Sequence, residues 1–389
     1  MKRIRLGMVG GGRDAFIGAV HRIAARLDDH FELVAGALSS DPVRARESGR
    51  DLGLATDRTY GTYQEMAAAE AARSDGIEAV SIVTPNNTHA AIAEAFLQRG
   101  IHVICDKPLA VSSEEAAKLV RLAKQANRIL AVTYNYSGYP MVRQAREMCR
   151  AGALGNVRLV QVEYLQDWLA NRVELLGSKQ AEWRTDPARA GAGGAIGDIG
   201  THAYHLMRFI TGLEVTELCA ELTTFAPGRR LDDNAQILLR LDSGARGMLW
   251  VSQVATGNEN ELAIRVYGDK GGLAWRQSDP NRLVHSPLNE PSEIITRGSR
   301  AAGEAAARVT RVPPGHPEGY LEAFAAIYAE IARAIRAAQA GQPAAGNIWY
   351  PDAGDGLDGV RFIEAAVRSS AGHGAWVSLD HSSPEVVLS

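Results

Sequence analysis

The fold of this chain is decided by residues 4–15, Ile-Arg-Leu-Gly-Met-Val-Gly-Gly-Gly-Arg-Asp-Ala. The apolar first half has the length of a buried strand, and the glycines that follow allow a tight turn. Gly10, Gly12 and Ala15 have the spacing of the dinucleotide-binding fingerprint, in which the turn lets a pyrophosphate approach the N-terminus of the next helix. An alternative alignment makes Gly18 the third small residue and enlarges the loop before it.

Outward from this turn, strand-length apolar runs alternate with helical patterns through the first third of the chain. The runs lie at 4–9, 33–38, 80–83, 101–105 and 129–134. Helices are predicted at 42–52 and 113–126, with Asp41 and Ser112 as their N-caps. This rhythm predicts βαβ units around a parallel sheet, and so a doubly wound, Rossmann-type α/β domain over residues 1–134.

A different pattern begins at residue 135. A helix is predicted at 140–151, and alternating strands are predicted at 157–164, 235–241, 247–254 and 262–267. Because turn-forming residues separate the later strands, we expect a largely antiparallel open sheet in an α+β domain over residues 135–389. Residues 286–317 are rich in proline and lack clear periodicity, so they are expected to form a long excursion.

Composition narrows the classes of function. Of 389 residues, 46% are hydrophobic and 22% charged, as in an ordinary globular protein. The formal net charge of -3 gives no reason to expect nucleic acid or an anionic membrane as a partner, so a small molecule is favoured. The three cysteines have no C-x-x-C spacing, which argues against a disulfide framework and a zinc site. No signal peptide or membrane span is recognised, and we expect a cytoplasmic protein.

The end of the second predicted strand bears on the choice between NAD and NADP. NAD-specific enzymes usually carry Asp or Glu there, where this chain has Ser39 and Ser40. Arg44 follows on the next helix, and together with Ser39 it could accept a 2′-phosphate. Ser39 and Asp41 could equally serve only to cap that helix. The sequence therefore predicts NAD or NADP without deciding between them.

Two segments follow strands at the edge of the sheet where open α/β folds bind ligands. Lys107 follows the strand at 101–105, and a cis bond to Pro108 would aim its side chain, although a lysine there could also be an idle surface residue. The segment Thr84-Pro85-Asn86, with His89 behind it, could reach a nicotinamide ribose. Thr88 as a plain helix N-cap explains part of the same pattern.

Residues 197–202, Gly-Asp-Ile-Gly-Thr-His, begin a helix that places Asp198 and His202 one turn apart. A histidine can take the proton of a carbinol as a hydride leaves, and a nearby carboxylate can bind substrate or steady the imidazolium. A simpler interpretation makes Asp198 the helix N-cap and His202 a satisfied, half-buried residue. No fourth ligand has convincing spacing to Asp198, His202 and His205, so no metal is expected.

Several polar and aromatic residues are candidates for a sugar site, because hydroxyls, amides and flat rings suit hydrogen bonds and CH contacts to sugar rings. They are Tyr134, Asn135, Tyr136, Gln166, Trp168, Trp183 and Arg184.

Taken in order, these motifs resemble the Gfo/Idh/MocA family of glucose-fructose oxidoreductases, inositol dehydrogenases and rhizopine catabolism proteins. The shared motifs are the glycine turn, Thr84-Pro85-Asn86 with His89, Asp106-Lys107-Pro108 where the family has Glu-Lys-Pro, and the motif at 197–202. The resemblance implies a Rossmann domain, a C-terminal domain whose open sheet often makes an oligomer interface, and a homo-oligomer such as a dimer or tetramer. It also implies NAD(P)-dependent oxidation or reduction of a ring hydroxyl.

By position in the family motifs, Lys107 would polarise or orient the reacting oxygen, Asp198 would bind substrate and His202 would be the acid/base. The residues expected to bind the dinucleotide are Gly10, Gly12, Ala15, Phe16, Ile17, Ser39, Ser40, Arg44, Thr84, Pro85, Asn86, His89, Asp106 and Lys107.

The leading hypothesis is a dehydrogenase acting on a sugar, an anhydrosugar such as levoglucosan, or an inositol. Two other functions stay open at this point: glycoside cleavage through transient oxidation with NAD, and a non-catalytic regulator that senses a dinucleotide.

Overall fold

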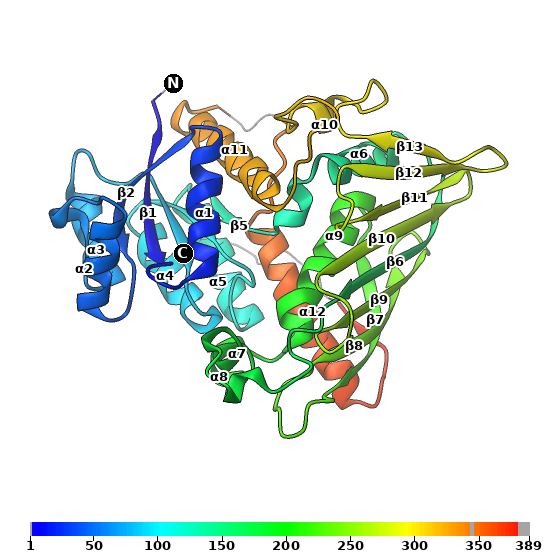
Figure 1. Cartoon of the computed structure of the whole chain (residues 1–389), viewed down its shortest axis with the longest axis horizontal. Coiled ribbons are helices and arrows are strands. Elements are labelled where there is room, and N and C mark those ends of the chain that lie inside the picture. Colours follow the sequence, from blue (N-terminus) through cyan, green and yellow to red (C-terminus); the bar gives the residue numbers. More distant parts are fainter. Residues whose placement is uncertain (1, 343–345, 380–389) are drawn as a thin grey trace. The chain divides into compact units, whose positions relative to one another are not determined.

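The computed structural model describes residues 2–342 and 346–379, which divide into two compact units (Figure 1). The first unit comprises the residues up to Asn135 together with Leu321–Leu357. The second comprises Tyr136–Tyr320 and the segment that starts at Asp358. We expected one boundary, between residues 134 and 135, whereas a later segment returns to the first unit. An amphipathic helical pattern does not tell which sheet the helix covers, so the sequence could not show this return.

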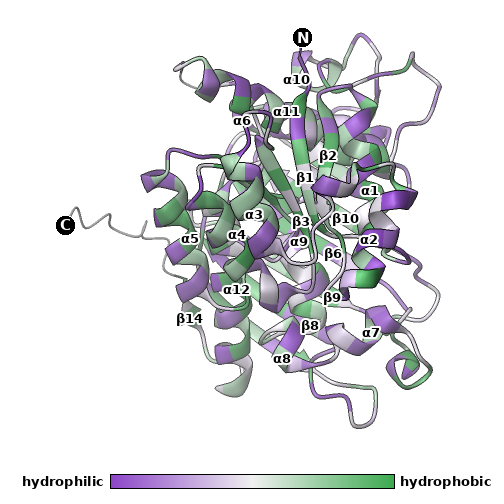
Figure 2. Cartoon of the chain, turned by 90° about the vertical axis from the view of Figure 1, so that its left-hand side faces the viewer, coloured by the Kyte–Doolittle hydropathy of each residue, from purple (hydrophilic) through white to green (hydrophobic). Residues whose placement is uncertain are grey.

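The first unit is built on a parallel sheet in the order β2-β1-β3-β4-β5. Strands β3 and β4 are buried along their whole length, which requires cover on both faces and agrees with the continuous apolar runs of the sequence. Figure 2 shows β1 and β3 of this sheet as largely hydrophobic. The strands are β1 (Ile4–Gly10), β2 (Phe31–Ala37), β3 (Ala79–Val83), β4 (His102–Cys105) and β5 (Leu130–Val132).

Helices surround this sheet, and the two predicted N-caps are confirmed. The Asp41 carboxylate accepts hydrogen bonds from the Val43 and Arg44 amides, and the Ser112 hydroxyl accepts one from the Glu115 amide. The helices of the unit are α1 (Phe16–Leu27), α2 (Pro42–Asp51), α3 (Tyr63–Ala72), α4 (His89–Leu97), α5 (Ser113–Gln125) and α11 (Tyr320–Gln339).

Helix α11 docks in the first unit through a buried polar cluster. The Tyr328 hydroxyl lies 2.8 Å from His21 Nδ1 on α1 and 3.0 Å from the Ser81 hydroxyl on β3. The Tyr328 ring also packs edge-on against Phe31. A helix distant in the sequence is therefore an integral part of the nucleotide-binding fold.

The second unit contains a nine-stranded sheet in the order β13-β12-β11-β10-β6-β9-β8-β7-β14. All its neighbouring strands are antiparallel except β6 and β9, so the predicted open, largely antiparallel sheet is confirmed. Buried residues alternate with exposed residues along β8 and with partly exposed ones along β10, as expected when one face packs on a core. The strands are β6 (Val157–Leu165), β7 (Val215–Thr223), β8 (Asn234–Leu241), β9 (Arg246–Ser252), β10 (Glu261–Gly268), β11 (Gly271–Arg276), β12 (Arg282–Pro287), β13 (Glu293–Thr296) and β14 (Val377–Ser378).

Helix α9 contacts β6, β9 and β10, and His202 of the predicted motif lies in its first turn, whereas Asp198 precedes the helix. The Tyr204 ring on α9 stacks on Phe362 of α12. The helices are α6 (Pro140–Arg150), α7 (Lys179–Arg184), α8 (Pro187–Ala190), α9 (Thr201–Thr211), α10 (Glu304–Ala307) and α12 (Ala353–Ala371), the last of which starts in the first unit.

The excursion predicted at 286–317 is more regular than expected. Strand β13 and the end of β12 extend the sheet, and α10 also falls in this segment. The buried Arg297 guanidinium donates to the carbonyls of Val312 and Pro313 and pairs with the Glu318 carboxylate 3.0 Å away. Side-chain bonds to backbone carbonyls hold this part together, and hydrophobic periodicity cannot detect such bonds.

Within the described residues, no helix combines the length and the apolar character needed to cross a bilayer.

Candidate active site

The glycine turn after β1 depends on a close approach between turn and helix. Gly10 and Gly11 have φ angles of 79° and 72°, in the left-handed region that favours glycine. A Cβ atom on Gly18 would lie 2.3 Å from the Gly11 Cα, so α1 can pack against the turn only with glycine at that position. The third glycine of the fingerprint is therefore Gly18, as in the alternative alignment, and Ala15 immediately precedes α1.

The N-terminus of α1 is suited to an anion. Ala15 offers no side-chain hydrogen bond to the first turn, and that turn contains no acidic residue. The first amides of the helix and the positive end of its dipole therefore favour a negatively charged group such as a pyrophosphate. Phe16 is 67% exposed beside this turn, whereas Ile17 packs into the core against Met8, Leu38 and Val83.

Buried His89 joins two loops at the carboxyl edge of the sheet. Its Nδ1 lies 2.8 Å from the Pro108 carbonyl oxygen, and its Nε2 lies 2.8 Å from the Thr84 carbonyl oxygen. Both ring nitrogens are thus used by the protein, and the structure favours an indirect role in which His89 positions the loops of Thr84 and Lys107. Asn86 is also largely buried beside it.

The loop after β4 holds Lys107 at the same edge. The Asp106 carboxylate accepts hydrogen bonds of 2.9 Å from the Lys107 amide and from the Thr133 hydroxyl. The Lys107–Pro108 peptide bond is cis, the geometry that the sequence suggested. Tyr134 and Asn135, which we predicted to bind substrate, are buried at the end of the first unit.

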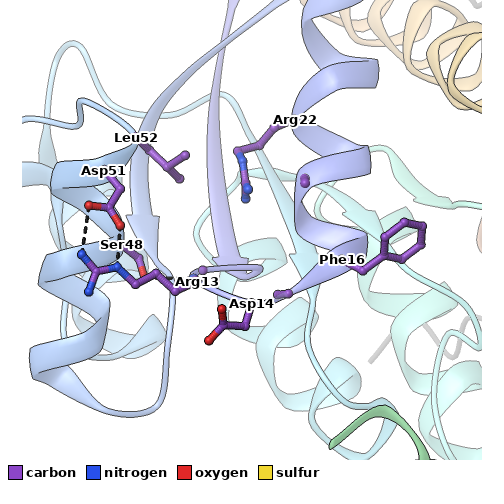
Figure 3. A pocket seen from close by; sticks show the side chains of 10 residues that line it. Arg13, Asp14, Phe16, Arg22, Ser48, Asp51 and Leu52 are labelled. Carbon is purple, nitrogen blue, oxygen red and sulfur yellow. Dashed lines mark hydrogen bonds and ion pairs between the residues drawn. The ribbon is translucent and has the colours of Figure 1, made fainter. Parts of the chain in front are cut away.

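A cavity of about 450 Å³ flanks the glycine turn between α1 and α2 (Figure 3). The Ser39 hydroxyl accepts a hydrogen bond from the Asp41 amide nearby, which supports the capping interpretation of Ser39. Arg44 donates to the Asp14 carboxylate across 2.6 Å, so this arginine is engaged by the turn itself. The lining residues are Gly12, Arg13, Asp14, Ala15, Phe16, Ala19, Arg22, Ser48, Asp51 and Leu52.

In the second unit, Asp198 stands in a single π-helical turn, Ile196–Gly200, directly before α9. Its Oδ2 accepts a hydrogen bond of 2.8 Å from Gln253 Nε2, and its Oδ1 lies 3.4 Å from Arg184 Nε. These two partners orient the carboxylate, so the structure does not support the interpretation of Asp198 as a simple helix cap. Turns of this kind are frequent at functional sites.

Asp232 holds the chain that leads into this turn. Its carboxylate accepts hydrogen bonds from the Gly194 amide at 2.6 Å and the Ile196 amide at 2.8 Å. Burial raises the pKa of Asp232 to about 6, although these two bonds favour the charged form.

His202 lies in the first turn of α9, largely buried among tyrosines. The ring of Tyr136 meets the imidazole edge-on, with a centroid distance of 5.0 Å. The hydroxyls of Tyr136 and Tyr164 are hydrogen-bonded to each other, and that of Tyr164 donates to Asn260 across 2.9 Å. Burial raises the pKa of both phenols, which keeps them neutral hydrogen-bonding groups.

The polar network continues through amides and an indole. Gln166 Nε2 donates to Asn260 Oδ1 across 2.6 Å, and Trp168 Nε1 donates to Gln166 Oε1 across 3.0 Å. Arg184, the ion-pair partner of Asp198, lies over the Trp183 ring at 4.2 Å. The second unit therefore brings together the predicted residues Tyr136, Gln166, Trp168, Trp183, Arg184, Asp198 and His202, whereas the dinucleotide residues and Lys107 belong to the first unit.

Sequence reasoning missed Tyr164, Gln253 and Asn260. Gln253 directly follows β9 and Asn260 directly precedes β10, so polar residues at strand ends were the available signal. Burial, together with the nearby Arg208 and Arg146, lowers the pKa of His205 well below its usual value, which keeps this imidazole neutral. Over 2–342 and 346–379, no group of three or more His, Cys, Asp or Glu side chains is arranged to hold a metal.

Comparison with known proteins places both units in one family. Residues 4–134 match the oxidoreductase family with an NAD-binding Rossmann fold, and residues 142–274 match the GFO/IDH/MocA C-terminal domain. The chain belongs to the Gfo/Idh/MocA family. This Gfo/Idh/MocA protein is 38% identical to the uncharacterized oxidoreductase YfiI of Bacillus subtilis over 380 residues, 97% of each chain.

Two solved structures of other bacterial proteins agree with this assignment. An oxidoreductase from Sinorhizobium meliloti is 55% identical, with a TM-score of 0.88 over 97% of this chain and 100% of its own. An inositol dehydrogenase homolog from Azotobacter vinelandii, solved with NADH and myo-inositol, is 38% identical, with a TM-score of 0.92 over 97% and 98% of the two chains.

As a Gfo/Idh/MocA member, the chain is an NAD-binding oxidoreductase that acts on hydroxyl groups. The predicted fold class and family are confirmed, and so is a nicotinamide dinucleotide as the cofactor. The non-catalytic regulator and the glycoside-cleaving enzyme considered from the sequence find no support in these relatives.

Proposed function

We propose that this protein is an NAD-dependent dehydrogenase that oxidises a ring hydroxyl of a neutral sugar or cyclitol, with an inositol as the first candidate. The observation that carries the proposal is the Asp198 carboxylate, oriented by Gln253 and Arg184, one helical turn before His202. Such a carboxylate can accept hydrogen bonds from ring hydroxyls next to a histidine that can accept a proton.

The roles of the side chains follow from their chemistry. His202 takes the hydroxyl proton of the substrate, and Asp198 accepts hydrogen bonds from that hydroxyl or its neighbour. Lys107, which follows β4, supplies a cation that polarises the reacting oxygen. NAD, when bound, accepts the hydride from the carbinol carbon.

A neutral substrate agrees with the balance of charge in the second unit. The positive charge of Arg184 is balanced by Asp198, and the network around His202 consists of neutral hydroxyl, amide and indole groups. These groups suit the several hydroxyls of a ring, as in myo-inositol, which the Azotobacter vinelandii homolog was solved with.

The test is a screen for NADH formation with myo-inositol and other inositols, levoglucosan and free aldoses. We expect one member of the panel to be oxidised, and His202→Asn to lower kcat about 10²- to 10⁴-fold, the usual contribution of a general base. NADH affinity should stay within about twofold of the wild type. His373→Asn, at an exposed position, is the matched control. Retained turnover in His202→Asn would rule out the proposed role.

We also propose a homo-oligomer formed through the outer face of the nine-stranded sheet. Support comes from large apolar side chains exposed on its strands, which are Leu159, Leu238, Met248, Tyr267 and Ile294.

A further inference from the structure

The enlarged glycine turn carries a carboxylate at a position that favours glycine. Asp14 has a φ angle of 65°, a conformation that aspartate tolerates better than most residues. Its side chain, 75% exposed, lies 2.6 Å from Arg44 Nη2, which also donates to the Arg13 carbonyl oxygen across 2.9 Å. Asp14 thus links the turn to the arginine in the first turn of α2.

The second arginine of this region is paired in the same way. Arg13 Nε lies 2.5 Å from Asp51 Oδ2, and Arg13 Nη2 lies 3.0 Å from Asp51 Oδ1 (Figure 3). The same guanidinium forms an ion pair with Glu47. The hydrogen bond with Asp51 raises the pKa of Arg13 and lowers that of Asp51, as expected for two oppositely charged side chains that form an ion pair. Three carboxylates therefore engage two arginines where the glycine turn meets α2.

This junction is where a dinucleotide fold distinguishes NAD from NADP. The adenosine ribose binds at the end of the second strand, and an arginine nearby accepts the 2′-phosphate of NADP. Here β2 is followed by Ser39 and Ser40, so the usual acidic residue that selects NAD is missing. Two cations at this place are Arg13 in the turn and Arg44 in the first turn of α2.

We propose that Asp14, Glu47 and Asp51 select NAD over NADP by occupying Arg13 and Arg44, with Asp14 as the decisive residue. A 2′-phosphate would have to displace these carboxylates and would meet their negative charge. Replacing Asp14 frees Arg44 and removes one of the three charges. The inference rests on dinucleotide binding by the first unit and is independent of the substrate assignment.

The test measures binding of NADH and NADPH separately to the purified full-length protein without substrate, by nicotinamide fluorescence. We expect the wild type to bind NADH at least about tenfold more tightly than NADPH. Asp14→Asn keeps a side chain that tolerates the left-handed backbone and removes the charge. It should bind NADPH about tenfold more tightly than the wild type, with NADH affinity within about twofold.

Two further measurements identify Arg44 as the cause. Adding Arg44→Ala to Asp14→Asn should return NADPH affinity to the wild-type value. The gain in Asp14→Asn should shrink as salt rises, because the released guanidinium is exposed to screening ions. Asp57→Asn, which removes an exposed carboxylate paired with Arg73 elsewhere in the first unit, is the matched control and should change neither affinity.

The inference is overturned if Asp14→Asn leaves the ratio of the two affinities unchanged, or if the wild type binds NADPH as tightly as NADH. A wild type that binds neither dinucleotide would overturn the cofactor assignment and this inference together. A protein inactive on every sugar and cyclitol, whose affinity ratio still shifts in Asp14→Asn, would overturn only the proposed substrate.

Discussion

Gln253 and Arg184 hold the Asp198 carboxylate from two sides, one oxygen each. An isolated carboxylate rotates among several positions, whereas one with two partners presents its remaining lone pairs in a set direction. Gln253 is therefore a positioning residue for the proposed reaction, because it acts on substrate through Asp198.

Gln253→Leu keeps most of the side-chain volume and removes the donor. A hydrogen bond to a charged group contributes about 1.5–3 kcal/mol, so we expect kcat/KM for the substrate to fall about 10- to 100-fold. NADH affinity should be unchanged, since the dinucleotide residues belong to the first unit. Steady-state kinetics and an NADH titration measure both, with Gln236→Leu, at an exposed position of β8, as the control. An unaltered kcat/KM would show that Gln253 is not needed to orient Asp198.

Helix α1 packs closely against the glycine turn, and a single residue, Gly18, permits this short distance. Alanine is normally a better helix residue than glycine by about 1 kcal/mol, so Gly18→Ala would stabilise an unconstrained helix. Here the added methyl group would meet the Gly11 backbone at 2.3 Å, and the helix must move away from the turn.

For Gly18→Ala we expect a loss of about 1–3 kcal/mol in the free energy of unfolding and at least a tenfold loss of NADH affinity. Urea denaturation and NADH titration measure the two effects. Gly319→Ala is the control, because a Cβ there meets no atom within 4 Å. A Gly18→Ala protein as stable as the wild type, with normal affinity, would mean that the turn adapts at no cost.

Elements with a strong hydrophobic period were predicted best, and the reason is visible in the second unit. Strands β6, β8, β9 and β10 alternate clearly and were expected, whereas β7, β12 and the short edge strand β13 were not. Strands β12 and β13 each bury only one residue, and the bonds of Arg297 to backbone carbonyls hold the segment that follows them. Such bonds leave no periodic trace in a sequence.

At the scale of the whole molecule, acid should affect the two units differently. Burial lowers the pKa of His21 and of His102 from 6.5 to about 4, and both rings lie in the first unit. The stability that comes from their neutral state is complete above pH 6.5 and is lost as the pH falls from 6.5 to 4. Each ring contributes up to about 3 kcal/mol to this loss. Asp232, in the second unit, has the opposite sign, because its raised pKa gives stability that is lost as the pH rises through about 6.

We therefore expect the first unit to unfold before the second in urea at pH 4.5, with closer transitions at pH 7. Every tryptophan except Trp349 belongs to the second unit, so the fluorescence transition should come after the circular dichroism transition at the lower pH. His102→Gln, which keeps an acceptor for the Ile129 amide, should reduce the separation. Coincident transitions at both pH values would contradict this assignment.

The sequence by itself determined the Rossmann sheet, the open sheet, the family, and the spacing that puts Asp198 about one helical turn before His202. These features follow from local periodicity, from turns that need glycine, and from residues one helical turn apart, all of which are encoded within short segments. The cap residues Asp41 and Ser112 belong to the same class, because a cap acts within three residues of its own position.

Only the tertiary structure decided which distant residues meet. It brought Gln253 and Arg184 into contact with Asp198, and it paired Asp14 with Arg44. It also packed α11 in the first unit and identified Gly18 as the third glycine of the fingerprint. The physical reason is that hydrogen bonds, ion pairs and close backbone contacts depend on separations of a few ångströms between segments tens or hundreds of residues apart, and no local pattern encodes those separations.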